Sequence, residues 1–161
     1  MTRRAAAAGS VVFFLAAPCV VAGLIPWLIS GWDFEEVSGW LIVLRVTGGL
    51  LILAGLLSVI ESFIRFVNEG RGTPAPAAAP EHLVIRGQYR YVRNPMYVAV
   101  GSVILGQALV IPSAALLVYL AVFFVTVASF VHFYEEPALE ARFGDEYTGY
   151  KTRVPAWWIR L

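Results

Sequence analysis

The sequence predicts an all-α integral membrane protein: a four-helix bundle with a C-terminal helical hairpin and a short amphipathic cytosolic tail. The chain has 161 residues, of which 59% are hydrophobic and only 14% are charged. A soluble domain carries about 25% charged residues, and the mean hydropathy of this chain is +0.73. A chain of this length has room for one domain, so we expect residues 1–161 to form a single membrane unit.

The first apolar stretch has no charged residue across residues 5–32. A membrane helix needs roughly 20 apolar residues, so this stretch predicts a span at about residues 9–29. Pro18 and Pro26 lie inside it and are expected to kink the helix without breaking it. Two arginines precede the stretch as in a signal peptide, but its length and the lack of a convincing cleavage site favour a retained signal anchor.

The second apolar stretch predicts a span at about residues 40–60. Arg45 lies near its start and can extend its charged end to the membrane surface along its aliphatic stem. Gly48, Gly49 and Gly55 predict a close approach of a neighbouring helix.

A polar cytosolic loop is expected over residues 61–95. Glu61 and Arg65 are four residues apart, which places them on one helix face as a candidate ion pair. Glycines and prolines in residues 70–80 forbid a regular helix. This part of the loop is either a linker or a cover for the site that follows it.

The longest uncharged run, residues 95–131, exceeds one span and is interrupted by Pro112 and Ser113. It predicts helices at about residues 96–111 and 114–134, which together form a hairpin. A hairpin returns the chain to the membrane face at which it entered. The polar groups on either side of the run therefore become neighbours in space.

Cations and phenols gather directly before this run. Residues 86–97 contain three arginines and three tyrosines, and Asn94 and Pro95 suit the N-cap and the first position of a helix. After the run, Glu135 and Glu136 stand at an expected helix end, where acidic groups oppose the helix dipole and are tolerated better with partners. Together these groups predict a site for a polar or anionic ligand at the bilayer edge.

Each of these signals also has a purely structural explanation. Arginines and tyrosines beside a span serve topology and anchoring, and the carboxylates can pair with the arginines alone. His132 lies inside the last apolar segment, where a histidine is either hydrogen-bonded packing or a functional group. The single cysteine, Cys19, excludes an internal disulfide, and no histidine or cysteine spacing suggests a metal site. The net charge of +1 gives no indication of a nucleic-acid partner.

The polar tail, residues 135–161, is expected to form short helices. Pro137 is expected to start one that Gly144 ends, and Asp145 is expected to cap another that carries two tyrosines. Apart from Arg45, every Lys and Arg lies near the N-terminus, in the polar loop or in the tail. Four spans place these three segments on one side, and the positive-inside rule makes that side, with both termini, cytoplasmic.

Two motifs resemble a known family. Residues 93–97, Arg-Asn-Pro-Met-Tyr, resemble the Arg-His-Pro-x-Tyr signature of the isoprenylcysteine carboxyl methyltransferase family, which itself resembles phospholipid N-methyltransferases. A second signature stands at residues 135–139, Glu-Glu-Pro-Ala-Leu, followed by aromatic and basic residues up to Pro155. The resemblance runs from Glu61 to the C-terminus, and the first two spans carry little of it.

This resemblance implies a membrane methyltransferase that uses S-adenosylmethionine and modifies a lipophilic small molecule or a lipid-attached carboxylate, thiol or amine. It implies a cofactor site formed by Tyr89, Arg93, Asn94, Pro95, Tyr97, Glu135 and Glu136. The catalytic candidates are His132, Arg93 and Arg90. Asn94 replaces the histidine of the commonest signature, and His132 stands about where many members have an arginine.

Two alternatives remain open at this point. One is an NADPH-dependent membrane reductase of the sterol-reductase type, because those enzymes also contain an Arg-x-Pro-x-Tyr element. The other is a non-catalytic membrane protein that keeps the pocket as a binding module. Methyl transfer from a sulfonium needs positioning more than acid–base groups, so the residues are compatible with a methyltransferase.

Overall fold

The computed structural model describes residues 17–34, 36, 39–65, 68 and 82–159. Within these residues the regular structure is helical and contains no strand, which confirms the all-α prediction. The helices, with π turns η1 and η5 and one 3₁₀ turn η4, are η1 (Val20–Leu24), α2 (Ile25–Ser30), α3 (Leu41–Arg65), η4 (Gly87–Arg90), α4 (Pro95–Val110), α5 (Ala114–Phe130), η5 (Val131–Glu135), α6 (Glu136–Phe143) and α7 (Asp145–Arg153). Residues 9–16 of the expected first span and the expected loop over 70–80 lie outside the described residues.

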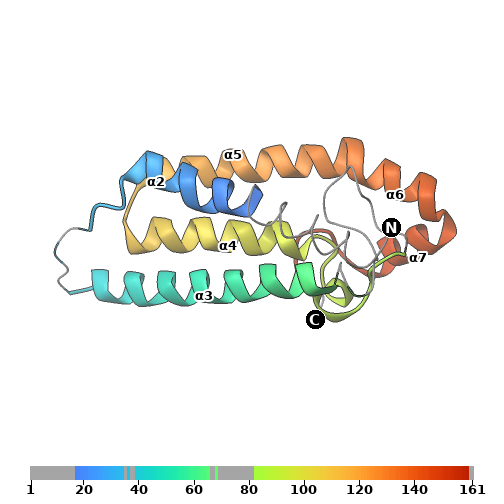
Figure 1. Cartoon of the computed structure of the whole chain (residues 1–161), viewed down its shortest axis with the longest axis horizontal. Coiled ribbons are helices and arrows are strands. Elements are labelled where there is room, and N and C mark those ends of the chain that lie inside the picture. Colours follow the sequence, from blue (N-terminus) through green and yellow to red (C-terminus); the bar gives the residue numbers. More distant parts are fainter. Residues whose placement is uncertain (1–16, 35, 37–38, 66–67, 69–81, 160–161) are drawn as a thin grey trace.

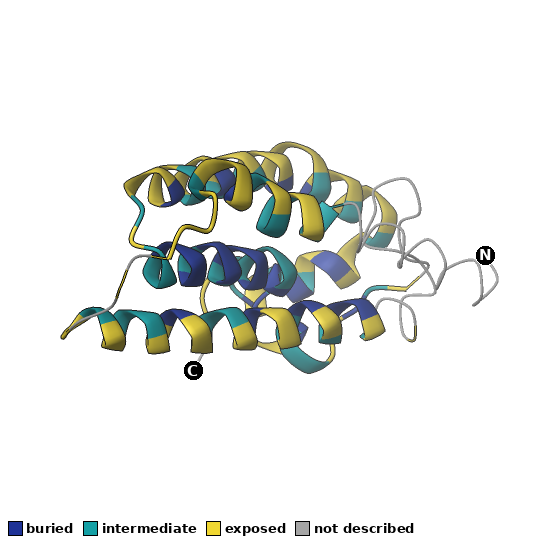
Figure 2. Cartoon of the chain, turned by 60° about the vertical axis from the view of Figure 1, so that its left-hand side comes forward, coloured by how far each residue is buried: buried dark blue, intermediate teal, exposed yellow. Residues whose placement is uncertain are grey.

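Helix α4 lies between α3 and α5, and α2 packs beside the start of α5 (Figure 1). Figure 2 shows that buried positions concentrate on α4, whereas the outer surfaces of α3 and α5 are exposed. Those outer surfaces are apolar, with Leu50 62% exposed on α3 and Val125 68% exposed on α5. Extended apolar surface of this kind is unfavourable in water and suits contact with lipid.

Two helices are long and apolar enough to cross a membrane, residues 41–65 and 114–143. The apolar helices at residues 17–30 and 95–110 are shorter. The second long helix has 30 residues, which corresponds to about 45 Å at 1.5 Å per residue. Because the hydrocarbon core of a bilayer is only about 30 Å thick, this helix is longer than a single crossing requires.

The contact between α3 and α4 depends on glycines. A Cβ atom on Gly48 would lie 2.5 Å from the Gly106 carbonyl oxygen, and one on Gly55 would lie 2.7 Å from the Ala99 carbonyl oxygen. The predicted close approach is therefore confirmed at these two positions. At Gly49 the prediction is wrong, because a Cβ atom there would meet nothing within 4 Å.

The first helix accommodates Pro26 through the π turn η1 rather than through a break. Proline has no N–H, so nearby carbonyl groups lose their helical donor. The Tyr119 hydroxyl donates to the Val21 carbonyl at 2.7 Å, and the Gln107 amide donates to the Ala22 carbonyl at 2.7 Å. Neighbouring helices thus satisfy the freed acceptors, a role for Gln107 and Tyr119 that the sequence pattern did not indicate.

The last apolar helix does not end near residue 134 as expected. It continues from Ala114 to Phe143 through η5 and α6. The interpretation of Glu135 and Glu136 as carboxylates at a helix C-terminus is therefore wrong, because two further turns follow them. Pro137 lies inside this continuous helix instead of starting a separate one.

Gly144 ends α6 as predicted, with a φ of +51° that suits a residue without a side chain. It is also the N-cap of α7, so Asp145 is the first residue of that helix rather than its cap. Tyr147 and Tyr150 of α7 pack in a small hydrophobic cluster with Val154. This cluster holds α7 against the end of the molecule at which α4 begins (Figure 1).

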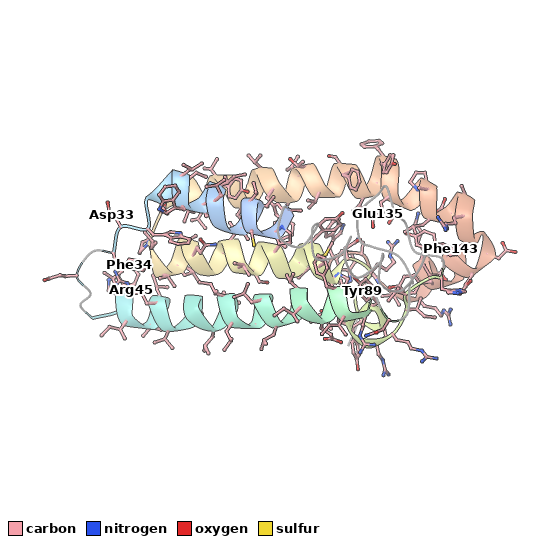
Figure 3. The ribbon with its side chains drawn as sticks, viewed as in Figure 1. Asp33, Phe34, Arg45, Tyr89, Glu135 and Phe143 are labelled. Carbon is pink, nitrogen blue, oxygen red and sulfur yellow. The ribbon has the colours of Figure 1, made fainter. Side chains whose placement is uncertain are left out.

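Arg45 lies at the opposite end of the molecule from Tyr89 and Glu135 (Figure 3). Its Nε donates to the Val110 carbonyl at 3.1 Å, and its guanidinium lies 5.9 Å from the centre of the Phe34 ring. The charge is thus held near the N-terminal end of α3, away from the middle of this apolar helix. At the other end, the expected pair of Glu61 and Arg65 is present, with 2.8 Å between Oε1 and Nε.

Candidate active site

A buried ionic cluster joins the segment before α4 to α6 and α7. Arg93 Nη1 lies 2.7 Å from Glu136 Oε1 and donates to the Tyr147 hydroxyl at 3.2 Å. The second oxygen of Glu136 lies 2.8 Å from Lys151 Nζ. The side chains of Arg93 and Glu136 are each only 11% exposed. We refer to Arg93, Glu136, Tyr147 and Lys151 as the Arg93 cluster.

The cluster has two cations and one carboxylate, and Lys151 has a second acidic partner in Glu140, with 2.8 Å between Nζ and Oε1. Hydrogen bonds to Glu136 and Glu140 raise the pKa of Lys151 above its ordinary value. Burial raises the pKa of the Tyr147 hydroxyl, so that group stays neutral. Both carboxylate oxygens of Glu136 thus contact cations of the same chain, Arg93 and Lys151.

A second carboxylate lies beside the cluster. The Tyr97 hydroxyl, in the first turns of α4, donates to Glu135 Oε2 at 3.3 Å. Among the described residues, this is the hydrogen bond that the Glu135 carboxylate accepts. Trp157 packs near Tyr97, with 6.5 Å between the ring centres. Adjacent carboxylates thus have different environments, one saturated by cations and the other with free acceptor capacity.

The C-terminal tail is pinned directly to this site. The Arg93 backbone N–H donates to the Pro155 carbonyl at 2.9 Å. Asn94 donates to the Ala156 carbonyl through both its backbone N–H and its side-chain amide, each at 3.2 Å. Asn94 is the N-cap residue of α4, as predicted, but its side-chain amide donates to the tail and makes no cap hydrogen bond to the helix. Pro95 is the first residue of α4, as predicted.

The turn that carries Tyr89 is anchored on two sides. Tyr89 is buried, and its carbonyl accepts a 2.6 Å hydrogen bond from the Tyr150 hydroxyl of α7. Its neighbour Gln88 donates to the Ser58 carbonyl at 2.7 Å and to the Ser62 hydroxyl at 2.9 Å, both on α3. The turn therefore connects α3 with α7 and sets the position of the chain just before Arg93.

Two of the predicted catalytic residues are not brought into the Arg93 cluster. The Arg90 side chain is exposed, and its guanidinium lies 5.0 Å from the centre of the Tyr91 ring. His132 is also exposed, and its ring lies edge-on to Phe133 with 4.8 Å between centres. The structure therefore groups Arg93, Tyr97, Glu135 and Glu136, with Tyr89, Asn94 and Pro95 as the frame around them.

Sequence reasoning missed Tyr147, Lys151, Gln88 and Trp157. One signal was available, because Tyr147 and Lys151 are four residues apart in a predicted helix and so share one face. Gln88 and Trp157 carried no such signal, since each contacts residues that are distant in sequence.

One polar atom of the cluster is buried without a partner among the described residues, the Nε of Arg93. A buried donor without an acceptor is unfavourable by about 1–3 kcal/mol, and an acceptor group of a bound ligand would satisfy it. A guanidinium suits a carboxylate, and the free acceptor capacity of Glu135 suits an amino or hydroxyl group. The arrangement can therefore hold a small molecule that carries both kinds of group.

Long helices with an exposed apolar surface and a buried ion pair at one end are features of a membrane protein. A family model described as phospholipid methyltransferase matches residues 43–146, from α3 into α7. The chain belongs to the phospholipid methyltransferase family, which confirms the resemblance seen in its motifs. This membership places it among membrane-associated methyltransferases of lipids or lipid-like substrates. No curated protein and no solved structure gives a significant match to this chain.

Proposed function

We propose that this protein transfers a methyl group from S-adenosylmethionine to a lipophilic or lipid-attached acceptor at the cytosolic face of a membrane. Family membership supports methyl transfer to a lipid-like substrate. The observation that carries the proposal is that the matched segment contains two groups with unused hydrogen-bonding capacity, the Arg93 Nε donor and the Glu135 carboxylate.

The residues present fit this cofactor. Arg93 would hold its carboxylate, because a guanidinium with a free buried N–H forms strong charge-assisted hydrogen bonds. Glu135 would accept hydrogen bonds from the amino group or the ribose hydroxyls. The rings of Tyr97 and Trp157 lie beside these groups and would attract a sulfonium or stack on adenine. When bound, the cofactor supplies an electrophilic methyl group.

The other residues of the site then act by position. Glu136 and Lys151 keep the Arg93 guanidinium in one place, since each is joined to the next at 2.7–2.8 Å. Asn94 and Pro95 set the start of α4, and Tyr89 sets the turn before it. A methyl transfer needs its two partners aligned in a site protected from water, and a rigid, buried cluster provides both conditions.

The acceptor would approach from the lipid side of the helices. Arg90 and His132 are exposed, so contact with the acceptor head group is the role left to them in this proposal. Either carboxyl O-methylation or N-methylation is compatible with these groups.

We also propose that the protein is multi-pass, with the Arg93 end and both termini in the cytoplasm. The segments at that end, which include Tyr89, α6 and α7, carry several basic residues, whereas Arg45 lies at the other end (Figures 1 and 3). This asymmetry follows the positive-inside rule. A cysteine introduced at exposed Glu140 is expected to react with a membrane-impermeant maleimide only after the cytoplasmic side is opened.

The test is calorimetric binding of S-adenosylhomocysteine to the detergent-purified full chain, with NADPH as the parallel titrant. We expect saturable binding of the former alone. Glu135→Gln should weaken binding about tenfold, whereas Glu140→Gln, which changes an exposed carboxylate outside the Arg93 cluster, should not. Binding of NADPH alone, or no difference between the two variants, would contradict the proposal. Transfer of a labelled methyl group from the cofactor into a lipid extract would then identify the acceptor class.

A further inference from the structure

The helix that carries both site carboxylates contains the π turn η5, which ends two residues before Pro137. In this turn the Glu136 N–H donates to the Val131 carbonyl, five residues earlier. A regular α-helix would require Pro137 to donate to the Phe133 carbonyl. Proline has no N–H, and its ring would clash with that carbonyl, so Pro137 disfavours the α-helical arrangement at this point.

The same arrangement occurs at a second proline. The π turn η1 ends two residues before Pro26, and the Ile25 N–H donates to the Val20 carbonyl, again five residues earlier. In both turns the N–H of the residue just before the proline donates to the carbonyl five residues earlier, rather than four as in an α-helix. Because η1 lies outside the Arg93 cluster, the pairing of a π turn with a proline does not depend on the charges of the site.

The π turn decides which glutamate faces Arg93. Val131 is 3% exposed and Glu136 is 9% exposed, so two residues five apart share the buried face. Before the turn, the buried residues of α5 are Leu116 and Phe123, which are seven residues apart, close to two full turns of a regular α-helix. A regular helix beyond Val131 would bring Glu135 onto the buried face and rotate Glu136 away by about 100°.

We propose that Pro137 is a positioning residue of the site. By maintaining the π turn, it aligns Glu136 with Arg93 and leaves Glu135 to Tyr97. The effect on cofactor binding rests on the proposed function, whereas the effect on the ion pair does not. Pro137 itself is exposed, so its replacement removes no core packing.

The first experiment compares three variants of the full chain by S-adenosylhomocysteine affinity and melting temperature. Pro137→Ala should weaken binding by about tenfold or more. Its melting temperature should not fall through loss of helix propensity, because alanine favours a helix interior more than proline does. A π turn contains one residue more than the corresponding α-helical turn. Deleting the exposed Phe133 in the Pro137→Ala chain removes this additional residue, returns Glu136 to the buried face of a regular helix and should restore affinity to within about threefold. Pro112→Ala, an exposed proline in the turn between α4 and α5, should bind like the parent.

Unchanged affinity in Pro137→Ala, or no recovery after the deletion, would overturn the proposal. A second experiment needs no cofactor: the coupling between Arg93→Met and Glu136→Gln is measured by thermal unfolding in the parent and in Pro137→Ala. We expect coupling in the parent that disappears in Pro137→Ala. If the parent binds no S-adenosylhomocysteine, the proposed function fails, yet coupling that persists in Pro137→Ala would still overturn the positioning role.

Discussion

Arg93 and Glu136 are 43 residues apart in sequence, yet their side chains meet at 2.7 Å with both largely buried. Two apolar helices separate them along the chain and return Glu136 to the end of the molecule where Arg93 lies. A buried ion pair is sensitive to the loss of either partner, because the remaining charge is left without compensation. This pair is therefore both the centre of the candidate site and a point at which the fold can be tested.

Glu136→Gln should destabilise the protein by roughly 3 kcal/mol, since it leaves the buried Arg93 guanidinium and Lys151 without their shared carboxylate. Thermal unfolding in detergent, followed by circular dichroism, measures this change. Glu140→Gln is the control, because it removes only the exposed contact with Lys151 and should cost less than about 1 kcal/mol. Equal destabilisation by the two substitutions would show that the buried pair is not special.

Tyr97→Phe should weaken S-adenosylhomocysteine binding about fivefold to tenfold while the melting temperature changes little. The substitution removes the hydroxyl that donates to Glu135 but keeps the ring beside Trp157. Without that donor the carboxylate is no longer held in one orientation. Tyr91→Phe, at a tyrosine that is 46% exposed, serves as the control and should bind normally.

Gly48→Ala and Gly49→Ala should have opposite effects although the residues are neighbours. The new methyl group at Gly48 would lie 2.5 Å from the Gly106 carbonyl oxygen, so α3 and α4 must separate, at a cost of about 1–3 kcal/mol. At Gly49 the methyl group meets nothing within 4 Å, and stability should stay the same or rise by roughly 0.5–1 kcal/mol. Melting temperatures of the two variants decide the matter, and a larger loss at Gly49 would contradict the described helix contact.

Stability should be nearly constant from neutral pH to about pH 9.5 and should fall above about pH 10. The raised pKa of Lys151 keeps its proton on the folded chain after the unfolded chain begins to lose it near 10.5. The raised pKa of Tyr147 acts in the same direction from about its ordinary value of 10.0. In both cases the folded state binds more protons above these values, so rising pH favours unfolding.

Melting temperatures between pH 7 and pH 11 test this expectation. Lys151→Gln should be less stable at pH 7 and should lose less stability above pH 10. A fall that begins below pH 9 would mean that other groups control the alkaline transition.

Much of the site was predictable from local sequence. The motif at residues 93–97 and the adjacent glutamates identified Arg93, Tyr97, Glu135 and Glu136, and the structure brings these four together. Arg90 and His132 were chosen for chemical type and position in sequence alone. Sequence position does not determine the direction of a side chain, and both face outward in the structure.

The sequence by itself determined that this is a helical membrane protein, because composition and the length of apolar runs set that outcome without any long-range contact. It also determined the family, because the motifs are short and contiguous. Only the tertiary structure decided that Glu136 forms ion pairs with Arg93 and Lys151, while Glu135 keeps free acceptor capacity. It likewise decided that the Asn94 side chain binds the tail rather than the start of α4. It also decided that the helix that begins at Ala114 continues through a π turn and past Pro137. The physical reason is that adjacent residues of the same type differ only through their partners, and those partners come from distant parts of the chain.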